Sequence, residues 1–545
     1  MFNNLILQSI TSNWDRDALT DYRGATLKYK DVGHGIAEIH LLLEAANVKK
    51  GDKVALCGRN SSNWCVSYLA ILSYGAVAVP ILHDFKADNI QHIVNHSDAV
   101  FFFVEENIWE NLDETTMPKL RAIVSIQQRR LLVCRSKKLK TCHADLAKSF
   151  NKRYPKGFKA AYLRFHNDNH EELAYISYTS GTTSFSKGVM VPYRSLESNI
   201  IFAQDHLHLS PGDNHVCFLP MAHAFGLLFS FLFEFTRGCH TFFLTRLPSP
   251  KVIFQAYAEV KPTLLIVVPL IVEKVVKKNV LPKLQTPTMR LALKVPGLRN
   301  ILLKQVRDKL TALFGGNFVE LVIGGASLNE EVETFLRDIH FPFTIGYGMT
   351  ECGPLISYSP WRQFKPDSCG RPVDRMTVRI LSNDPHNEAG EIVVKGDNLM
   401  MGYYKNEQST REAIDTDGWL HTGDLGTQDA EGNITIRGRS KNMILGPSGQ
   451  NIYPEEIEDK LNNLPLVAES VVVNREGKIV ALVHPDYQEA QQSQLTNADI
   501  EKQMTANLKL INQQLPNYSQ VSTIKIYAEE FEKTPKRSIK RYLYQ

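Results

Sequence analysis

The sequence predicts an α/β protein in which a large N-terminal region of mostly parallel sheets, flanked by helices, precedes a small α+β C-terminal domain. Short apolar runs rich in β-branched residues alternate with helical patterns up to about residue 350. Several runs are apolar on both faces, which is typical of strands covered by helices on two sides. At 545 residues the chain is too long for one ordinary core, so at least two packed domains are expected. The predicted strands include Val54–Cys57, Val77–Ile81, Val100–Val104, Leu264–Val268 and Val319–Ile323.

A capped helix is predicted between the first two of these strands. Ser61, Ser62 and Asn63 are residues that favour the position before a helix. The apolar stretch WCVSYLAILSY follows and ends at Gly75, which suits the left-handed residue after a helix. Strand, capped helix and strand in this order form a βαβ unit, which requires parallel strands.

The last hundred or so residues have a different pattern. A helix is predicted to start near Pro454, and two apolar runs, Ser470–Val473 and Ile479–Val483, flank a Glu-Gly turn as in a hairpin. A second helix is predicted after Thr496, with Asp499 as its capping-box partner. These elements predict a small α+β module with a core of its own.

The boundary between the two domains is expected near Arg439–Lys441. This point lies before a Gly-Pro-Ser-Gly loop at 446–449. The predicted domains are therefore residues 1–438 and residues 439–545.

Composition and charge exclude some classes of partner. Charged residues make up 22% of the chain and apolar residues 43%, the balance of a soluble globular protein. The formal net charge is only +4, so no nucleic-acid partner is expected. Eight cysteines are scattered without a C-x-x-C pair, which fits a reducing compartment better than a disulfide framework.

The chain has no obvious targeting or membrane-spanning segment. The N-terminus lacks a cationic leader, and its apolar stretch is too short for a secretory signal. The longest apolar run, Phe225–Phe233, is far short of the ~20 residues that span a bilayer. We therefore expect a cytoplasmic protein with at most peripheral membrane contact.

Two basic regions leave alternatives open. Residues 129–160 are interpreted as a solvated surface, the alternative being a contact with anionic lipid or with the phosphates of a nucleotide-containing thiol. Residues 272–310 are rich in Lys, Leu and Val. They are interpreted as surface helices, the alternative being amphipathic helices that lie near a membrane.

A candidate phosphate-binding loop follows the apolar run Leu173–Tyr178. It reads Thr179-Ser180-Gly181-Thr182-Thr183, with Lys187 and Gly188 shortly after. Hydroxyls and glycine-permitted backbone N–H groups can surround anionic oxygens, and the lysine adds a point charge. A flexible linker would have the same composition. A Walker-type loop is excluded because Gly follows Lys here and no Ser or Thr comes next.

This loop resembles the signature T-S-G-T-T-G-x-P-K-G of the adenylate-forming superfamily of acyl-CoA synthetases, luciferases and peptide-synthetase adenylation domains. Residues Thr179 to Gly188 match it except at Ser184 and Ser186. The resemblance extends over nearly the whole chain in the family's order. It implies ATP, Mg²⁺ and CoA as ligands and a C-terminal domain that is mobile.

Two further segments match the region that surrounds the acyl group and the base. Residues 219–226, LPMAHAFG, resemble the segment that places a histidine beside the acyl site, which makes His223 a candidate for the acyl or nucleotide pocket. A lone histidine is otherwise more often a packed core residue. Gly325 and Ala326 follow a predicted buried strand, as backbone lying against a nucleobase would.

The segment Gly346–Glu351 is similar to the family's Y-G-x-T-E motif. The resemblance implies that Tyr347, Gly348 and Thr350 contact the nucleotide. Tyr347 offers a stacking face, and Glu351 offers a hard oxygen for Mg²⁺. We expect Thr182 of the phosphate loop to be a second metal ligand. In isolation, a tight turn would explain the glycines equally well.

The strongest match is the block 417–444. By resemblance, Asp424 accepts hydrogen bonds from the ribose hydroxyls, Arg439 contacts ribose or phosphate, and Lys441 is the hinge between the domains. The loop that follows resembles the lining of the pantetheine tunnel. Its predicted CoA contacts are Gly446 and Gly449.

The chain departs from the family in its C-terminal motif. The family form resembles T-P-x-x-K-x-K-R, whereas residues 534–541 place Ser538 at the expected lysine. Lys536 and Lys540 lie two residues on either side and share a face with Ser538 in an extended segment. We expect one of them to take the catalytic role, together with Lys187, Glu351 and His223.

The resemblance implies an acyl-CoA synthetase that activates a medium- to long-chain fatty acid through acyl-AMP and transfers it to CoA. The apolar, aromatic segment Ala224–Phe235 is either a wall for the alkyl chain or ordinary core. Two alternatives remain: an enzyme that transfers the acyl group to an acyl carrier protein or another acceptor, and a non-catalytic nucleotide- or acyl-binding relative.

Overall fold

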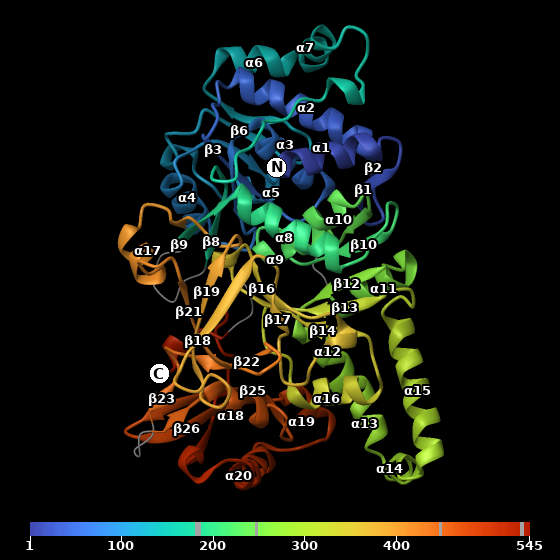
Figure 1. Cartoon of the computed structure of the whole chain (residues 1–545), viewed down its shortest axis with the longest axis vertical. Helices are drawn as coiled ribbons and strands as arrows, with labels where there is room; N and C mark the ends of the chain where they lie inside the picture. The colour runs from blue at the N-terminus through green and yellow to red at the C-terminus, as the bar shows by residue number, and fades with distance from the viewer. Residues whose placement is uncertain (180–186, 246–248, 446–449, 535–538) are drawn as a thin grey trace.

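The computed structural model describes residues 1–179, 187–245, 249–445, 450–534 and 539–545. Figure 1 shows the N-terminal half of the chain at one end of an elongated molecule and the C-terminal elements at the other end. The intervening sheets and helices lie between the two ends.

The largest sheet has eight strands in the order β20-β9-β8-β4-β3-β5-β6-β7. Its centre is parallel, since β3 pairs with β4 and β5, and β4 pairs with β8, in that sense. The two edges are antiparallel. The strands are β3 (Lys53–Cys57), β4 (Val77–Ile81), β5 (Ala99–Val104), β6 (Ala122–Ser125), β7 (Leu131–Cys134), β8 (Leu173–Thr179), β9 (Lys187–Pro192) and β20 (Gly402–Tyr403).

Both faces of this sheet are buried, as the apolar runs predicted. Val54 and Leu56 of β3 belong to the main core, whereas Ala55 and Cys57 belong to a second core on the opposite face. Helices α2 (Tyr29–Ala45) and α3 (Ser62–Tyr74) contribute to the first core, and α4 (Ala87–His96) contributes to the second.

The predicted βαβ unit is confirmed. The hydroxyl oxygen of Ser61 accepts a hydrogen bond from the backbone N–H of Trp64 at 3.2 Å, which caps α3. Gly75 follows the helix with φ 86°, a left-handed conformation that glycine adopts without steric cost.

Two smaller, mainly parallel sheets follow. One has the order β10-β11-β1-β2 and the other the order β12-β13-β14. Their strands are β1 (Asp17–Asp21), β2 (Thr26–Lys28), β10 (Asn214–Cys217), β11 (His240–Phe243), β12 (Leu264–Val267), β13 (Glu320–Ile323) and β14 (Phe343–Ile345).

From residue 347 to residue 439 the strands pair in the antiparallel sense, which the sequence pattern had not addressed. One sheet has the order β15-β16-β17 and the other the order β18-β19-β21-β22. The strands are β15 (Tyr347–Gly348), β16 (Leu355–Tyr358), β17 (Arg371–Pro372), β18 (Met376–Leu381), β19 (Gly390–Gly396), β21 (Leu420–Gln428) and β22 (Ile434–Arg439).

The C-terminal elements form the predicted α+β module. Strands β25 (Val467–Arg475) and β26 (Lys478–Pro485) make the hairpin, and β27 (Thr523–Ile526) pairs with β26 in parallel. The turn residues Glu476 and Gly477 have φ 53° and 77°, as a tight hairpin turn requires. Helix α18 is Pro454–Leu461, and α20 (Asn497–Gln514) carries the predicted capping box between Thr496 and Asp499.

Hydrogen bonds hold α18 and the residues after it against the N-terminal region. The ammonium of Lys277 donates to the side-chain oxygen of Asn463 at 2.7 Å, and the amide of Asn329 donates to the carboxylate of Asp459 at 2.8 Å. In the described part of the chain, no helix is both long and apolar enough to cross a membrane.

A buried ion pair anchors the end of the chain to this module. The guanidinium of Arg541 donates to the carboxylate of Glu458, which also accepts the backbone N–H of Val472 at 2.5 Å. Burial raises the pKa of Glu458 to about 7, although Arg541 and the N–H of Val472 favour the ionised carboxylate.

We expect Glu458→Gln to reduce the pH dependence of stability. The folded chain holds the Glu458 proton more tightly than an unfolded chain with the usual pKa of 4.5. This group therefore makes the free energy of unfolding fall as the pH rises from about 4.5 to about 7. Above about pH 7 the variant lacks the carboxylate that pairs with Arg541, whereas below that pH the wild-type side chain is itself protonated and the neutral amide resembles it. The Tm of the variant should fall less than the wild-type Tm between about pH 5 and pH 8.

Thermal unfolding followed by fluorescence measures this difference. The matched control is Glu501→Gln, since Glu501 is exposed on α20 and its replacement should leave the wild-type slope unchanged. An equal slope in the wild type and in Glu458→Gln would show that Glu458 does not titrate in this range.

Candidate functional site

The ends of several strands bring the predicted segments together. Strand β8 ends at Thr179 and β9 begins at Lys187, and these two residues pair in the ladder. Strand β13 ends beside Gly324, and the N–H of Gly346, which follows β14, donates to the carbonyl of Ile323 at 2.9 Å. The phosphate-loop lysine and the Gly-Tyr-Gly segment are therefore placed by hydrogen-bonded sheets.

Lys187, Tyr403 and Glu351 form the first cluster of the site. The ammonium of Lys187 lies 4.8 Å from the centre of the Tyr403 ring, and the Tyr403 hydroxyl donates to Glu351 Oε1 at 2.9 Å. Burial, followed by the nearby charge of Glu351, raises the pKa of Tyr403, so this phenol stays protonated and donates. The arrangement places a cation over the face of one aromatic ring and a carboxylate at the hydroxyl of that ring.

Backbone hydrogen bonds hold this cluster in place. Strand β20, which carries Tyr403, pairs with β9 next to Lys187. The N–H of Met400 donates to the carbonyl of Glu351 at 2.8 Å, and the N–H of Tyr404 donates to the carbonyl of Gly188 at 2.8 Å. Segment 400–404 thus connects two motifs that are far apart in the sequence.

Asp424 is the centre of the second cluster. Its side chain is 6% exposed. The Tyr347 hydroxyl donates to Oδ2 at 2.7 Å, and Arg439 Nε lies 2.9 Å from Oδ1. Asp424 and Arg439 are also ladder partners in β21 and β22. Each carboxylate oxygen has a second lone pair, so these contacts leave acceptor capacity for two ligand hydroxyls.

The charge state of Asp424 reflects opposing effects. Burial raises its pKa above the usual aspartate value, while Arg439 and the Tyr347 hydroxyl act in the opposite direction. Burial also raises the pKa of Tyr347 well above 10, with Asp424 as the next contributor. Tyr347 is therefore a hydrogen-bond donor to this carboxylate.

Two glycines of the site, Gly348 and Gly325, occur for different structural reasons. A Cβ at Gly348 would lie 2.1 Å from the carbonyl oxygen of Pro354, so packing inside the protein already requires glycine there. Gly325 has φ +88° and is exposed. Ala326 beside it is also exposed, so the backbone of both residues is accessible. Thr350, in contrast, is buried.

His223 lies at the start of α9 (Ala224–Leu227) and is partly buried. Most of the segment Ala224–Phe235 is buried in the main core, which favours the core-packing interpretation for its greater part. Phe225 is the partly buried exception among its phenylalanines. A Cβ at Gly324 would lie 2.8 Å from the Phe225 ring, so glycine lets this ring lie against the end of β13.

Several predicted residues lie outside the described part of the chain: Ser180, Gly181, Thr182, Thr183, Gly446, Gly449 and Lys536. Lys540 is described, and its ammonium lies 3.1 Å from Glu532 Oε2. Both residues belong to the C-terminal module. Lys441 is exposed, two residues after Arg439. The roles of all these residues remain predictions.

The donor set around Glu351 fits a magnesium ion that is bound together with nucleotide phosphates. One oxygen of Glu351 accepts from Tyr403, and the other makes no hydrogen bond with a described residue. Across the described ranges, no group of three or more His, Cys, Asp or Glu side chains is placed to hold a metal ion. Mg²⁺ at phosphate sites commonly uses one or two carboxylates with phosphates and water, so a single carboxylate is sufficient.

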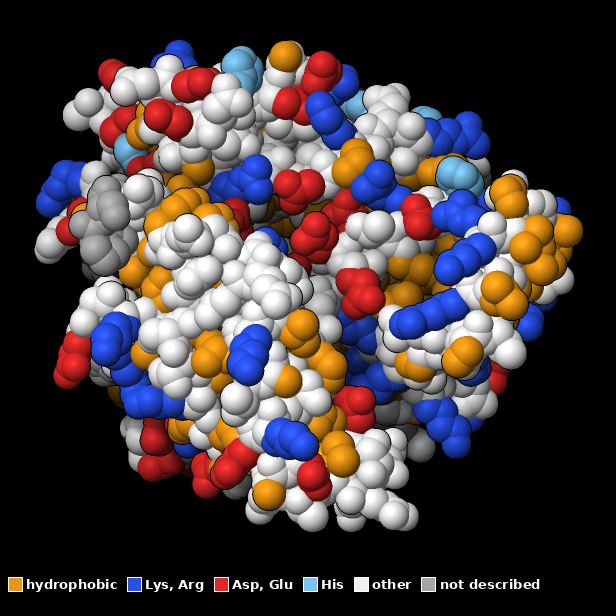
Figure 2. All heavy atoms as spheres, turned by 90° about the horizontal axis from the view of Figure 1, so that it is seen from below, with side chains coloured by type: hydrophobic (Ala, Val, Ile, Leu, Met, Phe, Trp, Pro, Cys, Tyr) orange, Lys and Arg blue, Asp and Glu red, His pale blue; other side chains and the backbone are white. Residues whose placement is uncertain are grey.

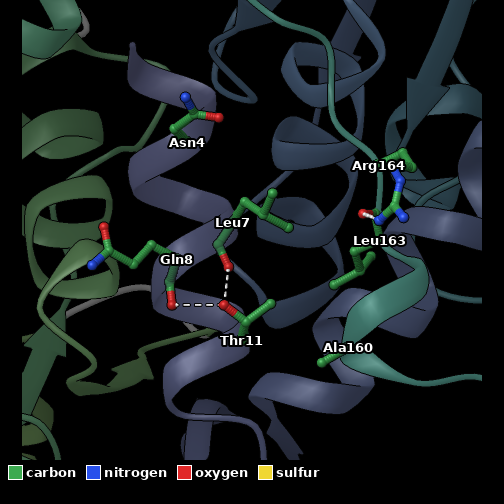
Figure 3. A pocket seen from close by; sticks show the side chains of 7 residues that line it. All are labelled: Asn4, Leu7, Gln8, Thr11, Ala160, Leu163 and Arg164. Atoms are coloured by element: carbon green, nitrogen blue, oxygen red, sulfur yellow. Dashed lines mark hydrogen bonds between the residues drawn. The ribbon is translucent and has the colours of Figure 1, made fainter.

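A shallow hollow elsewhere on the N-terminal half is not part of this site. It has a volume of about 460 Å³ and lies between α1 (Phe2–Ser12) and segment 160–164 (Figure 3). The Thr11 hydroxyl bonds back to the Leu7 and Gln8 carbonyls, so it is satisfied within α1. The hollow is lined by Asn4, Leu7, Gln8, Thr11, Ala160, Leu163 and Arg164, none of which is a predicted site residue.

The sequence interpretation missed Tyr403. This residue lies in the short segment MMGYYK, where neither periodicity nor charge distinguishes it from its neighbour Tyr404. Only the pairing of β20 with β9 places its ring over Lys187.

A lysine and a carboxylate at the phosphate loop, a second carboxylate with acceptor capacity and a small C-terminal module define a nucleotide-binding enzyme of two parts. The chain belongs to the AMP-binding enzyme family. The family's sequence pattern matches residues 8–404, and the pattern of the AMP-binding enzyme C-terminal domain matches residues 441–544. The predicted resemblance to adenylate-forming enzymes is thereby confirmed.

Curated relatives match most of the chain. Long-chain-fatty-acid–CoA ligase FadD15 of Mycobacterium bovis is 29% identical over 459 residues, which cover 79% of this chain and 72% of that protein. Long chain acyl-CoA synthetase 3 of Arabidopsis thaliana is 28% identical over 494 residues, which cover 84% and 73%.

Solved structures confirm the predicted fold class. ATP-bound MatB from Rhodopseudomonas palustris superposes with a TM-score of 0.77 at 21% identity, covering 100% of this chain and 98% of that one. A Mycobacterium tuberculosis fatty acyl CoA synthetase has a TM-score of 0.67 at 20% identity, covering 99% and 97%. At these identities the likeness concerns the fold alone.

We expect Tyr403→Phe to weaken the use of Mg²⁺ and ATP. Phenylalanine keeps the ring beside Lys187 but removes the hydroxyl that orients Glu351, so pyrophosphate release should fall by roughly tenfold. The Mg²⁺ concentration needed for half-maximal rate should rise. Tyr403→Ala, which also removes the ring, should reduce the rate of pyrophosphate release further.

The matched control is Tyr404→Phe. The Tyr404 hydroxyl donates to Asp98 at 2.8 Å, and Asp98 is not a residue of the candidate site. That variant should release pyrophosphate at the wild-type rate. Equal rates and equal Mg²⁺ requirements in Tyr403→Phe and the wild type would exclude a positioning role for the hydroxyl.

Proposed function

We propose that this chain is an acyl-CoA synthetase that activates a medium- to long-chain fatty acid through acyl-AMP and transfers the acyl group to CoA. The products are acyl-CoA, AMP and pyrophosphate. The observation that carries this proposal is that Tyr403 contacts both Lys187, through its ring, and Glu351, through its hydroxyl, beside the predicted phosphate loop. The names of the curated relatives support the same class of ligase.

In the first half-reaction, a carboxylate oxygen of the fatty acid attacks the α-phosphorus of ATP. The bond between the α-phosphorus and its bridging oxygen breaks, and pyrophosphate leaves. Lys187 stabilises the negative charge that develops on the leaving group. Magnesium supplies further positive charge to the phosphates when it is bound with ATP.

The second cluster binds the nucleoside. The remaining lone pairs of Asp424 accept hydrogen bonds from the two ribose hydroxyls, while Tyr347 and Arg439 keep the carboxylate in one orientation. The exposed backbone at Gly325 and Ala326 offers a surface for the base. These interactions fix the α-phosphorus relative to the incoming carboxylate.

In the second half-reaction, the CoA thiolate attacks the acyl carbonyl and AMP leaves with the electrons of the broken carbon–oxygen bond. We propose that the C-terminal module, from residue 439 onward, turns about Lys441 between the two steps. Gly446 and Gly449 would then border the pantetheine chain. The Lys540–Glu532 ion pair lies within the module, so this lysine is paired with a carboxylate of the module itself.

The identity of the acid follows from the relatives more than from the site. Phe225 beside Gly324 offers an apolar surface for an alkyl chain. Transfer to an acyl carrier protein is the alternative for the acceptor, and a non-catalytic binding role is the alternative that Ser538 raises. Residence in the cytoplasm remains a prediction.

The test is mass spectrometry of the purified chain with ATP, Mg²⁺, CoA and a pool of fatty acids of different lengths. We expect acyl-CoA products of medium or long chain length, together with AMP and not ADP. Accumulation of acyl-AMP alone would indicate that the acceptor of the acyl group is not CoA. No product with any acid would favour the non-catalytic alternative. A Lys187→Ala variant serves as the inactive control.

We also expect one of the two lysines beside Ser538 to act in adenylation. Lys536→Ala or Lys540→Ala should reduce acyl-AMP formation by at least about tenfold. Transfer from preformed acyl-AMP to CoA should be affected much less. Ser538→Ala is the matched control and should keep both rates. Wild-type adenylation in both single variants and in the double variant would contradict this role.

A further inference from the structure

A helical arm is inserted between β12 and β13. It contains α13 (Leu281–Leu284), α14 (Pro287–Leu293) and α15 (Pro296–Leu313). In Figure 1 the arm runs along one edge of the molecule and carries α14 at its far end. Leu303, Val306 and Leu310 of α15 pack on the main core. The N-terminal turns of α15 and the adjoining α14 have few such anchors.

The tip of this arm exposes large apolar side chains. Leu291, Val295, Leu298 and Ile301 are 69%, 52%, 42% and 56% exposed. Leu298 and Ile301 are three residues apart, so they share one face of α15. Single exposed apolar residues are ordinary, whereas a group of four within eleven residues at a protruding tip is typical of an interaction surface.

Basic residues surround these apolar side chains. Residues 274–310 contain ten Lys and Arg and a single acidic residue, Asp308, in a chain whose net charge is only +4. Arg290, Lys294 and Lys304 make no ion pair with any residue of the described ranges. Figure 2 shows apolar and basic side chains intermingled on the lobe that α13–α15 form at the right of the view.

We propose that the tip of this arm, residues 290–304, docks on an anionic lipid surface. Apolar side chains enter the interface between headgroups and acyl chains, and the surrounding cations meet the lipid phosphates. A nucleic acid would satisfy the cations but offers no apolar phase to four large side chains. The two kinds of side chain together therefore match a membrane surface.

Docking at this place has a structural consequence. The arm leads directly into β13, whose end carries Gly324 and Gly325 of the candidate site. Phe225 lies against that same end. The proposed lipid contact is thus connected to the site through one helix and one strand, while the rest of the chain remains outside the bilayer.

The test uses the full chain and sedimentation with unilamellar vesicles. One set of vesicles is phosphatidylcholine alone, and the other contains about 30% phosphatidylglycerol. We expect binding to the anionic vesicles only, reduced by salt of about 0.5 M. Leu298→Ser/Ile301→Ser should weaken this binding roughly tenfold or more. Arg290→Gln/Lys294→Gln, which keeps the apolar tip, should also weaken it.

The control is Leu381→Ser/Leu510→Ser, which removes two comparably exposed apolar side chains from β18 and α20. It should bind vesicles as the wild type does. All variants change exposed residues, so their circular dichroism and Tm should match the wild type. Absence of wild-type binding to anionic vesicles would overturn the proposal, as would equal losses in the control. Binding of an acidic protein by the same tip, without vesicle binding, would also overturn it.

Discussion

A buried carboxylate needs partners, and the partners of Asp424 hold the candidate site together. Its side chain is almost entirely removed from water, where an unpaired charge would be strongly destabilising. Tyr347 and Arg439 supply the donors, one from the Gly-Tyr-Gly strand and one from the end of β22. The requirement of one side chain therefore fixes the relative position of two sheets. It also fixes the point at which the chain leaves the N-terminal region, two residues before Lys441.

A comparable connection joins Lys187, at the end of the predicted phosphate loop, to the carboxylate of Glu351. Lys187 starts β9, and Glu351 follows a short strand more than 160 residues later along the chain. The two-residue strand β20 pairs with β9 and turns the Tyr403 ring toward Lys187 and its hydroxyl toward Glu351. Because a ring and a hydroxyl interact with opposite charges, one tyrosine can position both groups without neutralising either.

The features that the sequence predicted well depend on neighbouring residues. The Ser61 cap, the Gly75 helix end, the Glu476–Gly477 turn and the capping box at Thr496 are all decided within a few positions, and each was confirmed. The Tyr403 contact escaped prediction because it depends on strands more than 200 residues apart. The antiparallel sheets after residue 347 escaped for a different reason: their strands are near neighbours in the sequence, but alternation within a strand does not specify its partner. Resemblance to a family supplied the site residues that local patterns could not distinguish from turns.

The C-terminal segment contains one strong anchor and one weak one, and this difference bears on the proposed role of Lys540. Arg541 and Glu458 form a buried pair supported by the backbone of Val472, so separating them would leave uncompensated charge. Lys540 and Glu532 form an exposed pair, which contributes at most about 1 kcal/mol. A lysine held this weakly can leave its partner when another anion becomes available. Arg541 meanwhile keeps the segment attached to the module. A movement of the whole module would therefore move Lys540 with it, and its ammonium group could then pair with another anion.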